Sequence, residues 1–251
     1  MRPIALLLLA PALVAQAPAL SVDQLLAKNF EAKGGLAKIK ALKSVKMTGR
    51  LMQGPMEIAI SGIQARGAFR MEVSVQGMTQ ITAFDGKAGW KIDPFQGYGG
   101  GKNAEAFTAD EMKAAEVQAD LDGPVVDYAA KGHKVEYMGK DTVEGAPAHK
   151  LKVTLKNGDV QTYYLDADSY LEVKQTSKRK IREQEVEMET YYGDFREVAG
   201  VLMPFSIEQG MPGMPQRAKI IVDKIEPNVT LDPASLKMPA PVAAPAAPAV
   251  K

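Results

Sequence analysis

A strict alternation of apolar and polar residues, repeated in one segment after another, is the feature that most constrains how this chain folds. Val45 begins the first such segment, and others occupy residues 56–60, 69–75, 150–155 and 185–190. A period of two places successive side chains on opposite faces of a β-strand, so each segment has one apolar face. Turn sequences such as Asp85-Gly86 and Asn157-Gly158 separate the segments and favour antiparallel neighbours. We therefore expect about ten or eleven strands in one antiparallel series.

Two segments interrupt this pattern with helix signals. The pairs Ser21/Gln24 and Thr108/Glu111 have the spacing of a capping box. The first predicted helix covers residues 21–43 with a break or kink at Gly34-Gly35, and the second runs from 108 to about 121. Strands do not alternate with long helices, which disfavours a parallel α/β sheet. The sequence predicts a mainly β (α+β) fold with a single curved antiparallel sheet.

The predicted sheet offers more apolar surface than two short helices can cover. About ten strands of roughly 17 Å must bury one apolar face. A curved sheet with helices across its mouth would leave a hydrophobic cavity, and methionine side chains adapt well to irregular apolar ligands. The alternative is that the same side chains pack a dry core. From the phase of the alternation, the predicted lipid-binding residues are Met47, Leu51, Met56, Ile58, Ile60, Met71, Val73, Val75, Trp90, Ile92, Leu151, Val153 and Met188.

Neither end of the chain reads as part of the folded domain. Residues 1–19 are predicted to be a signal peptide, because Arg2 precedes an apolar stretch too short to span a bilayer, and small residues follow it. Cleavage is expected after Ala19, which predicts an exported protein, periplasmic in a host with two membranes. Residues 239–251 are rich in proline and alanine and are predicted to be a disordered tail. Residues 20–238 are then one domain.

Composition disfavours several classes of function. The 31 Lys+Arg residues balance 30 Asp+Glu residues, whereas a nucleic-acid-binding protein usually has a basic excess. The sequence has no cysteine and only two histidines, so we expect no thiolate catalysis, no metal site and no cofactor. His149 is in phase with the apolar residue Leu151, which indicates a hydrogen-bonded core histidine, with a catalytic base as the alternative.

Several segments, in order, resemble the LolA-like superfamily of periplasmic lipoprotein-carrier and lipoprotein-sorting proteins. They are similar to the family's arginine-containing strand start, its Asp-Gly-Lys hairpin with tryptophan, its Pro-Phe strand end, its aromatic-Leu-Asp hairpin and its Gly-Val-x-x-Pro strand start. In this chain they are residues Gln64–Arg70, Ala83–Trp90, Ile92–Phe95, Tyr163–Asp168 and Val198–Pro204. The resemblance extends over most of residues 21–238.

The resemblance implies an incomplete β-barrel with helices as a lid over its concave face, and a cavity that shelters acyl chains. It also implies that Arg66 gates the lid, although Gly67 stands where the family has proline. The lipid-anchored receptor branch of this fold has an N-terminal cysteine, which this sequence lacks, so a freely soluble protein is expected.

The function predicted from these features is that of a soluble periplasmic carrier or chaperone, without enzymatic activity. It would bind the acyl chains of lipoproteins or lipids for transfer towards the outer membrane. The expected partners are acylated lipoproteins or lipids, together with inner-membrane donor and outer-membrane acceptor complexes, and the protein is expected to be a monomer. Alternatives are a periplasmic sensor or regulator of envelope stress with the same fold, an enzyme acting on lipids or glycans, and a purely structural β-domain with a filled interior.

Overall fold

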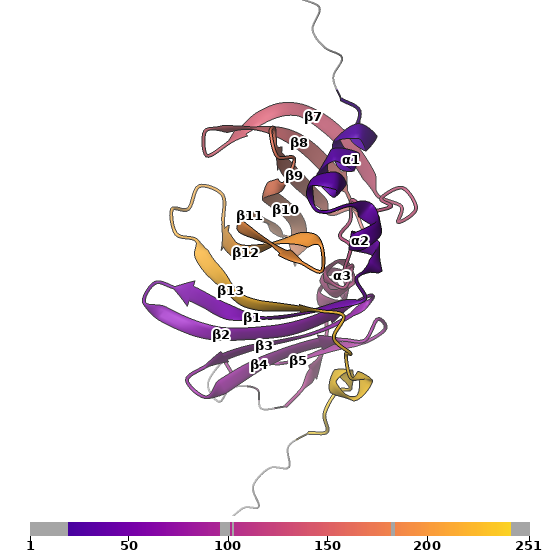
Figure 1. Cartoon of the computed structure of the whole chain (residues 1–251). Helices are drawn as coiled ribbons and strands as arrows, with labels where there is room; N and C mark the ends of the chain where they lie inside the picture. The colour runs from indigo at the N-terminus through magenta and orange to yellow at the C-terminus, as the bar shows by residue number, and fades with distance from the viewer. Residues whose placement is uncertain (1–19, 96–100, 102, 182–183, 242–251) are drawn as a thin grey trace, which may run out of the picture.

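The strands pair into one antiparallel sheet in which the first and the last strand lie side by side near the centre. The computed structural model describes residues 20–95, 101, 103–181 and 184–241 (Figure 1). The predicted signal peptide and residues 242–251 of the predicted tail lie outside the described residues. The strand order is β6-β5-β4-β3-β2-β1-β13-β12-β11-β10-β9-β8-β7, and the sheet is open at both edges. The prediction of a single antiparallel sheet is confirmed.

Within the described residues the sheet has 13 strands, slightly more than the sequence predicts. The first arm of the sheet contains β1 (Ser44–Gln53), β2 (Met56–Ala65), β3 (Ala68–Val75), β4 (Met78–Phe84), β5 (Gly89–Ile92) and the two-residue β6 (Glu105–Ala106). The second arm contains β7 (Lys134–Val143), β8 (Ala146–Thr154), β9 (Val160–Asp166), β10 (Glu172–Ile181), β11 (Gln184–Val198), β12 (Val201–Gly210) and β13 (Ala218–Pro227).

The described residues also form three α-helices, α1 (Val22–Ala32), α2 (Leu36–Ala41) and α3 (Ala109–Gln118), and one 3-10 helix, η1 (Pro233–Leu236). Ser21 and Thr108 form the predicted capping boxes at the starts of α1 and α3. The predicted break falls between α1 and α2, where Gly34 and Gly35 have φ angles of +107° and +105°. Such angles favour glycine because it has no Cβ atom.

The three α-helices in the described part of the chain lie on one face of the sheet, which we call the concave face. The register places Met47, Gly62 and Met71 opposite one another, so they share a face. In the first arm, α3 packs on this face through Ala115 and Ala119, against Phe69 and Phe84. In the second arm, Leu25 and Leu26 of α1 pack against Leu151 and Val153. Figure 1 shows the sheet bending around a central space, with the helices along one side of it.

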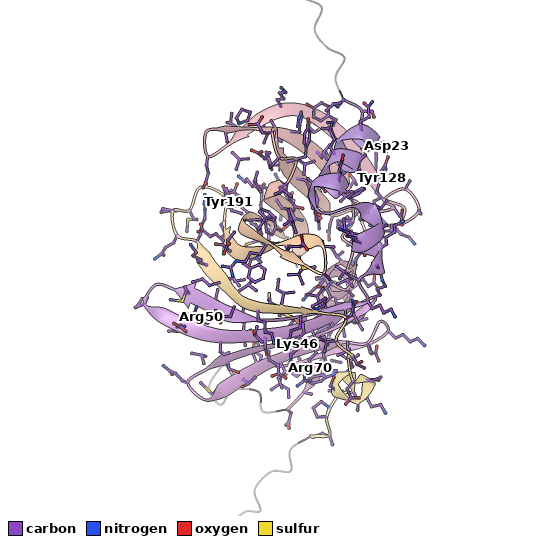
Figure 2. All side chains as sticks on the ribbon, in the orientation of Figure 1. Asp23, Lys46, Arg50, Arg70, Tyr128 and Tyr191 are labelled. Carbon is purple, nitrogen blue, oxygen red and sulfur yellow. The ribbon has the colours of Figure 1, made fainter. Side chains whose placement is uncertain are left out.

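The opposite, convex face is polar across the second arm of the sheet. Lys150, Tyr164, Lys174 and Tyr191 pair in succession across β8 to β11. The ammonium group of Lys174 lies 4.9 Å from the ring centroid of Tyr191, which fits a cation–π contact. Arg50 and Tyr191, both labelled in Figure 2, mark this face in the two arms. In the second arm the convex face is therefore lined by charged and aromatic side chains.

Trp90 and Ile92 lie on the convex face, so the prediction that they line the concave face is wrong. They pair with Ala83 and Ile81, whereas Met71 pairs with the intervening residue Thr82. Trp90 is 4% exposed and donates a hydrogen bond from Nε1 to the carbonyl oxygen of Leu236, at 2.7 Å. The residues around η1 therefore cover these two side chains from outside the curved sheet.

Candidate functional site

An unbroken row of apolar and aromatic side chains crosses the middle of the concave face. Successive partners in the register are Tyr192, Ile207, Ile220, Leu51 and Ile58, on β11, β12, β13, β1 and β2. Neighbouring strands are about 4.8 Å apart, so the row is about 19 Å long. That is roughly the span of an extended long-chain acyl group.

The middle of this row is only partly buried, unlike its surroundings under the helices. Leu51, Ile207 and Ile220 are intermediate in exposure, whereas Leu151 and Val153 beneath α1 are both 0% exposed. Figure 2 shows side chains from both arms of the sheet projecting into the space between them, with Asp23 of α1 and its hydrogen-bond partner Tyr128 labelled. The helices therefore close the two ends of the concave face more completely than its centre.

Methionines flank the row on the same face. Met47 and Met203 are partly buried in a cluster with Phe205 and Val222. Met71 lies over Gly62, where a Cβ atom would overlap the Met71 sulfur. Unbranched thioether side chains of this kind can change rotamer and make room for an irregular apolar ligand.

Most of the predicted lipid-binding residues share the concave face, but in three different environments. Leu151 and Val153 are packed beneath α1, and Met56 is 45% exposed at the tip of the β1–β2 hairpin. The register places the others on the concave face, where Ile58 and Ile60 are buried and the rest are partly exposed; they are Met47, Leu51, Ile58, Ile60, Met71, Val73, Val75 and Met188.

The prediction missed the contribution of β12 and β13. The alternation Val201, Met203, Phe205 and Ile207 is present in the sequence and was a usable signal. In β13 the pattern is broken, because Asp223 is an extra residue opposite the Thr48–Gly49 step. Such a β-bulge shifts the phase of the apolar residues by one position.

A polar cluster interrupts the apolar surface near Tyr192. The hydroxyl of Tyr163 donates to Oε1 of Gln161 at 2.7 Å, and the hydroxyl of Tyr192 donates to Oε1 of Gln175 at 2.8 Å. Nε2 of Gln175 in turn donates to Oε1 of Gln161 at 2.9 Å. Glu172 pairs with Leu165 and so shares this face. Burial raises the pKa of its carboxyl to about 7, although Lys33 opposes the shift.

Arg66, which the family resemblance implies is a lid residue, joins the β2–β3 hairpin to two helical segments. Its guanidinium donates to both carboxylate oxygens of Asp122, after α3, and to the carbonyl oxygen of Lys40 in α2, at 2.7 Å. Beside it, Gln64 Nε2 and the Gly67 amide donate to the carbonyl oxygens of Gln118 and Ala119. These carbonyls would otherwise lack partners at a helix end. The helix therefore ends at Gln118, before the predicted position 121.

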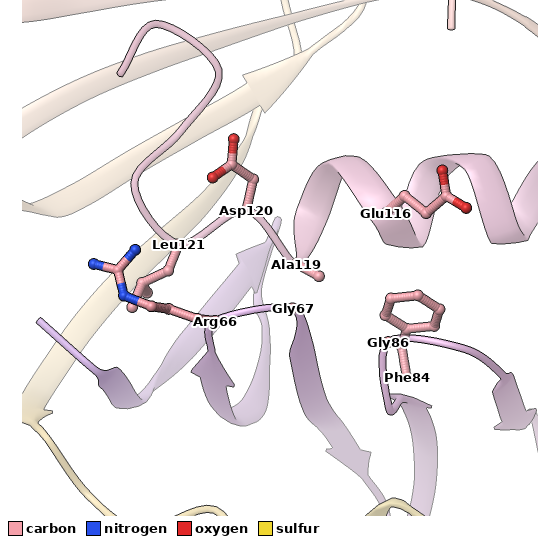
Figure 3. A pocket seen from close by; sticks show the side chains of 8 residues that line it. All are labelled: Arg66, Gly67, Phe84, Gly86, Glu116, Ala119, Asp120 and Leu121. Carbon is pink, nitrogen blue, oxygen red and sulfur yellow. The ribbon is translucent and has the colours of Figure 1, made fainter. Parts of the chain in front are cut away.

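A small cleft of about 340 Å³ lies beside this junction, between the end of α3 and the hairpins of the first arm. Figure 3 shows Arg66 and Asp120 at one side of the cleft and Glu116 above Phe84 at the other. Charged side chains thus surround the contact between helix and sheet, where water can compete for it.

A larger cleft, of about 1010 Å³, opens beside the first half of α3. Lys91 and Glu111 form an ion pair there, at 2.6 Å. Burial alone would raise the pKa of Glu111, but hydrogen bonds from Lys91 and Thr108 outweigh it and lower that pKa. The cleft is therefore polar; the other residues that line it include Asp110, Lys113, Lys152, Asp159, Lys178 and Glu185.

His149 has the contacts of a core residue. It is 6% exposed, its Nδ1 lies 3.0 Å from the hydroxyl of Tyr137, and its ring stacks on Tyr170. Burial lowers the pKa of the imidazole, with the positive charge of Lys140 adding to the effect. A neutral, hydrogen-bonded side chain fits this environment.

No helix within the described residues has both the length and the apolar character needed to cross a bilayer. No family model matches the sequence, and no curated protein matches it. Solved structures do match. A LolA superfamily protein of Nitrosomonas europaea superposes with a TM-score of 0.55 and 8% identity over 87% of this chain and 98% of that one.

Two further solved structures superpose on this chain with similar TM-scores. A DUF1329 family protein of Desulfovibrio piger has a TM-score of 0.54 and 11% identity, covering 83% of this chain and 98% of its own. A domain of Vibrio parahaemolyticus named as an outer membrane lipoprotein-sorting protein has a TM-score of 0.52 and 9% identity, covering 83% and 96%. The chain therefore has the fold of the LolA superfamily, an open, curved antiparallel sheet with helices on its concave face.

Proposed function

We propose that this protein is a soluble, exported carrier or chaperone that binds the acyl chains of lipoproteins or lipids against its concave face. It would shelter them on the way towards the outer membrane of a two-membrane host. The observation that carries the proposal is the row from Tyr192 to Ile58, an apolar strip whose centre the helices leave partly uncovered.

The energetics of acyl chains explain why such a strip is useful. Burying one methylene group is worth about 0.8 kcal/mol, so a chain of about 16 carbons in water costs on the order of 12 kcal/mol. A carrier must cover most of that surface and later release it. An apolar face beneath helices held by a few polar contacts meets both needs, because loss of those contacts lowers the affinity.

The comparisons support this proposal at the level of the fold, since one of the matched structures is named as a lipoprotein-sorting domain.

Native mass spectrometry of gently purified protein tests the proposed function. We expect a population carrying a lipid or an acylated peptide, which organic extraction removes. Repeated isolation of ligand-free protein, together with no binding of added acyl ligands, would contradict the proposal.

The Arg66→Ala variant tests the proposed lid. Loss of the guanidinium removes charged hydrogen bonds to Asp122 and Lys40, each worth about 1.5–3 kcal/mol before discounting for solvent. Because Arg66 is 44% exposed, we expect a smaller effect, about tenfold faster amide hydrogen exchange in residues 109–122.

Arg50→Ala is the matched control for this experiment. Arg50 also pairs with an aspartate, Asp223 at 3.0 Å, but on the convex face and away from the helices. Exchange in residues 109–122 should stay at the wild-type rate in this variant. Equal protection of the segment in wild type and Arg66→Ala would show that Arg66 does not hold the lid.

A further inference from the structure

One carboxylate on the concave face lacks a hydrogen-bond donor. Glu172 begins β10 opposite Leu165, which packs in the cluster beneath α1. Its side chain is partly buried, and no hydrogen bond to it is found within residues 20–95, 101, 103–181 and 184–241. No buried side-chain oxygen or nitrogen in the described part of the chain lacks a hydrogen-bond partner, so the Glu172 carboxylate still contacts solvent. A ligand that brings its own donors can replace that solvent when its chain covers the concave face.

The neighbouring hydroxyl groups do not supply that donor. Burial raises the pKa of the Tyr163 and Tyr192 phenols, and the negative charge of nearby Glu172 raises both pKa values further. Yet the Tyr163 hydroxyl donates to Gln161 and the Tyr192 hydroxyl donates to Gln175. Each phenol has one hydrogen to give, so neither is available to the carboxylate.

The charges around Glu172 also leave it unpaired. The nearby cation is Lys33, the C-cap residue of α1, which favours the ionised carboxyl but forms no ion pair with it in the described structure. The titratable groups that face Glu172 from the adjoining strands are Tyr163 of β9 and Tyr192 of β11. Asp120, in the segment after α3, lies close enough to Tyr163 for its negative charge to raise the pKa of that phenol. Burial outweighs Lys33 and raises the pKa of Glu172 to about 7.

We propose that Glu172 is the polar anchor of the acyl-binding site and that it accepts hydrogen bonds from a ligand head that carries donors, an amine or an amide. This inference rests on the proposed function. The chain would extend from Tyr192 along Ile207 and Ile220 to Leu51, while the head satisfies the carboxylate at the end of that row. A free fatty acid would place a second carboxylate beside the first, and two like charges disfavour each other at short range.

Competition between two ligands of equal chain length tests the proposal. Dodecylamine and dodecanoate displace a fluorescent fatty-acid probe at pH 8.5, where Glu172 and both ligands are ionised. We expect the wild-type protein to bind dodecylamine about tenfold or more tightly than dodecanoate. In Glu172→Gln the preference should fall to within about threefold. Glu197→Gln, which alters an exposed carboxylate on β11, should keep the wild-type preference.

The outcomes separate this inference from the carrier function. Equal binding of the two ligands by wild-type protein would overturn the role of Glu172 while leaving the acyl-binding face intact. Failure of both ligands and of the probe to bind would instead overturn the proposed function. Equal binding by the wild type overturns the role of Glu172 even if the variant fails to fold, and loss of the preference in Glu172→Gln assigns the preference to this residue.

A stability measurement gives an independent readout of the same carboxyl group. Its pKa is higher in the folded state than the ordinary value of 4.5, so its protonation stabilises the fold at low pH. That stabilisation is lost as the pH rises from about 4.5 through about 7. We expect the thermal midpoint of wild type to fall, relative to that of Glu172→Gln, over this interval. Parallel curves would contradict a desolvated carboxyl at this position.

Discussion

Replacing Gly34 by alanine is expected to lower the free energy of unfolding by about 3 kcal/mol or more. The new Cβ atom would overlap the carbonyl oxygen of Gly200, in the turn between β11 and β12. That neighbour is backbone, so it cannot move aside as a flexible side chain would. The same contact is held by a hydrogen bond from the Leu202 amide to the Lys33 carbonyl oxygen, at 2.9 Å. Urea unfolding of the variant measures the effect.

Gly35→Ala is the matched control, because it separates steric overlap from backbone strain. Gly35 has a φ of +105°, nearly that of Gly34, but an added Cβ there would meet no atom within 4 Å. Its cost should be limited to that of the unusual φ angle, roughly 1–2 kcal/mol. If the two variants lose equal stability, the α1–α2 turn does not dock on the sheet as described.

The Leu51→Glu variant is expected to lose acyl binding by at least about 100-fold while remaining folded. Leu51 lies in the middle of the apolar row and is partly exposed, so the native fold tolerates a polar side chain there. A bound acyl chain would have to desolvate the new carboxylate, which costs several kcal/mol. A loss of 100-fold corresponds to about 2.7 kcal/mol. Displacement of a fluorescent fatty-acid probe gives the two affinities.

Met52→Glu is the control in the same strand. Met52 follows Leu51, is also partly exposed, and points to the convex face. The Met52→Glu variant makes the same change in charge as Leu51→Glu and has nearly the same effect on strand propensity. Because its new carboxylate lies on the convex face, its acyl affinity should stay within about threefold of that of the wild type. Similar losses in both variants would show that binding does not depend on the face of the sheet.

The local elements of this fold were readable from sequence because their signals are local. The capping boxes at Ser21 and Thr108 form as predicted, and Gly34 and Gly35 separate two helices. The alternation that starts at Val45 identified β1 correctly as a strand of an antiparallel sheet. In each case a few neighbouring residues determine the backbone conformation.

The choice of face was less predictable, since it depends on pairing between strands. The β5 strand covers only Gly89–Ile92, and so short a segment does not fix its own phase. The turn between β4 and β5 sets the register that pairs Trp90 with Ala83, and this register places Trp90 on the convex face. In β13 the bulge at Asp223 concealed the contribution of Ile220 to the row.

Which parts of the concave face are covered depends on where the helices pack. No local sequence pattern determines that packing. Leu151 and Val153 are on the predicted face but are packed against Leu25 and Leu26. Glu172 is one acidic residue among many in the sequence, and only the fold places it beside two phenols. Sequence therefore predicted the apolar strip better than the polar anchor within it.

The central claim is that acyl chains lie along the centre of the concave face, and photo-crosslinking tests it most directly. A fatty amine with a diazirine in its chain is bound, irradiated, and mapped by peptide mass spectrometry. The predicted sites of attachment are concave-face residues of β1, β12 and β13, among them Leu51, Ile207 and Ile220. Attachment confined to the convex face around Met52, or to the exposed hairpin tips at Met56 and Met78, would contradict it.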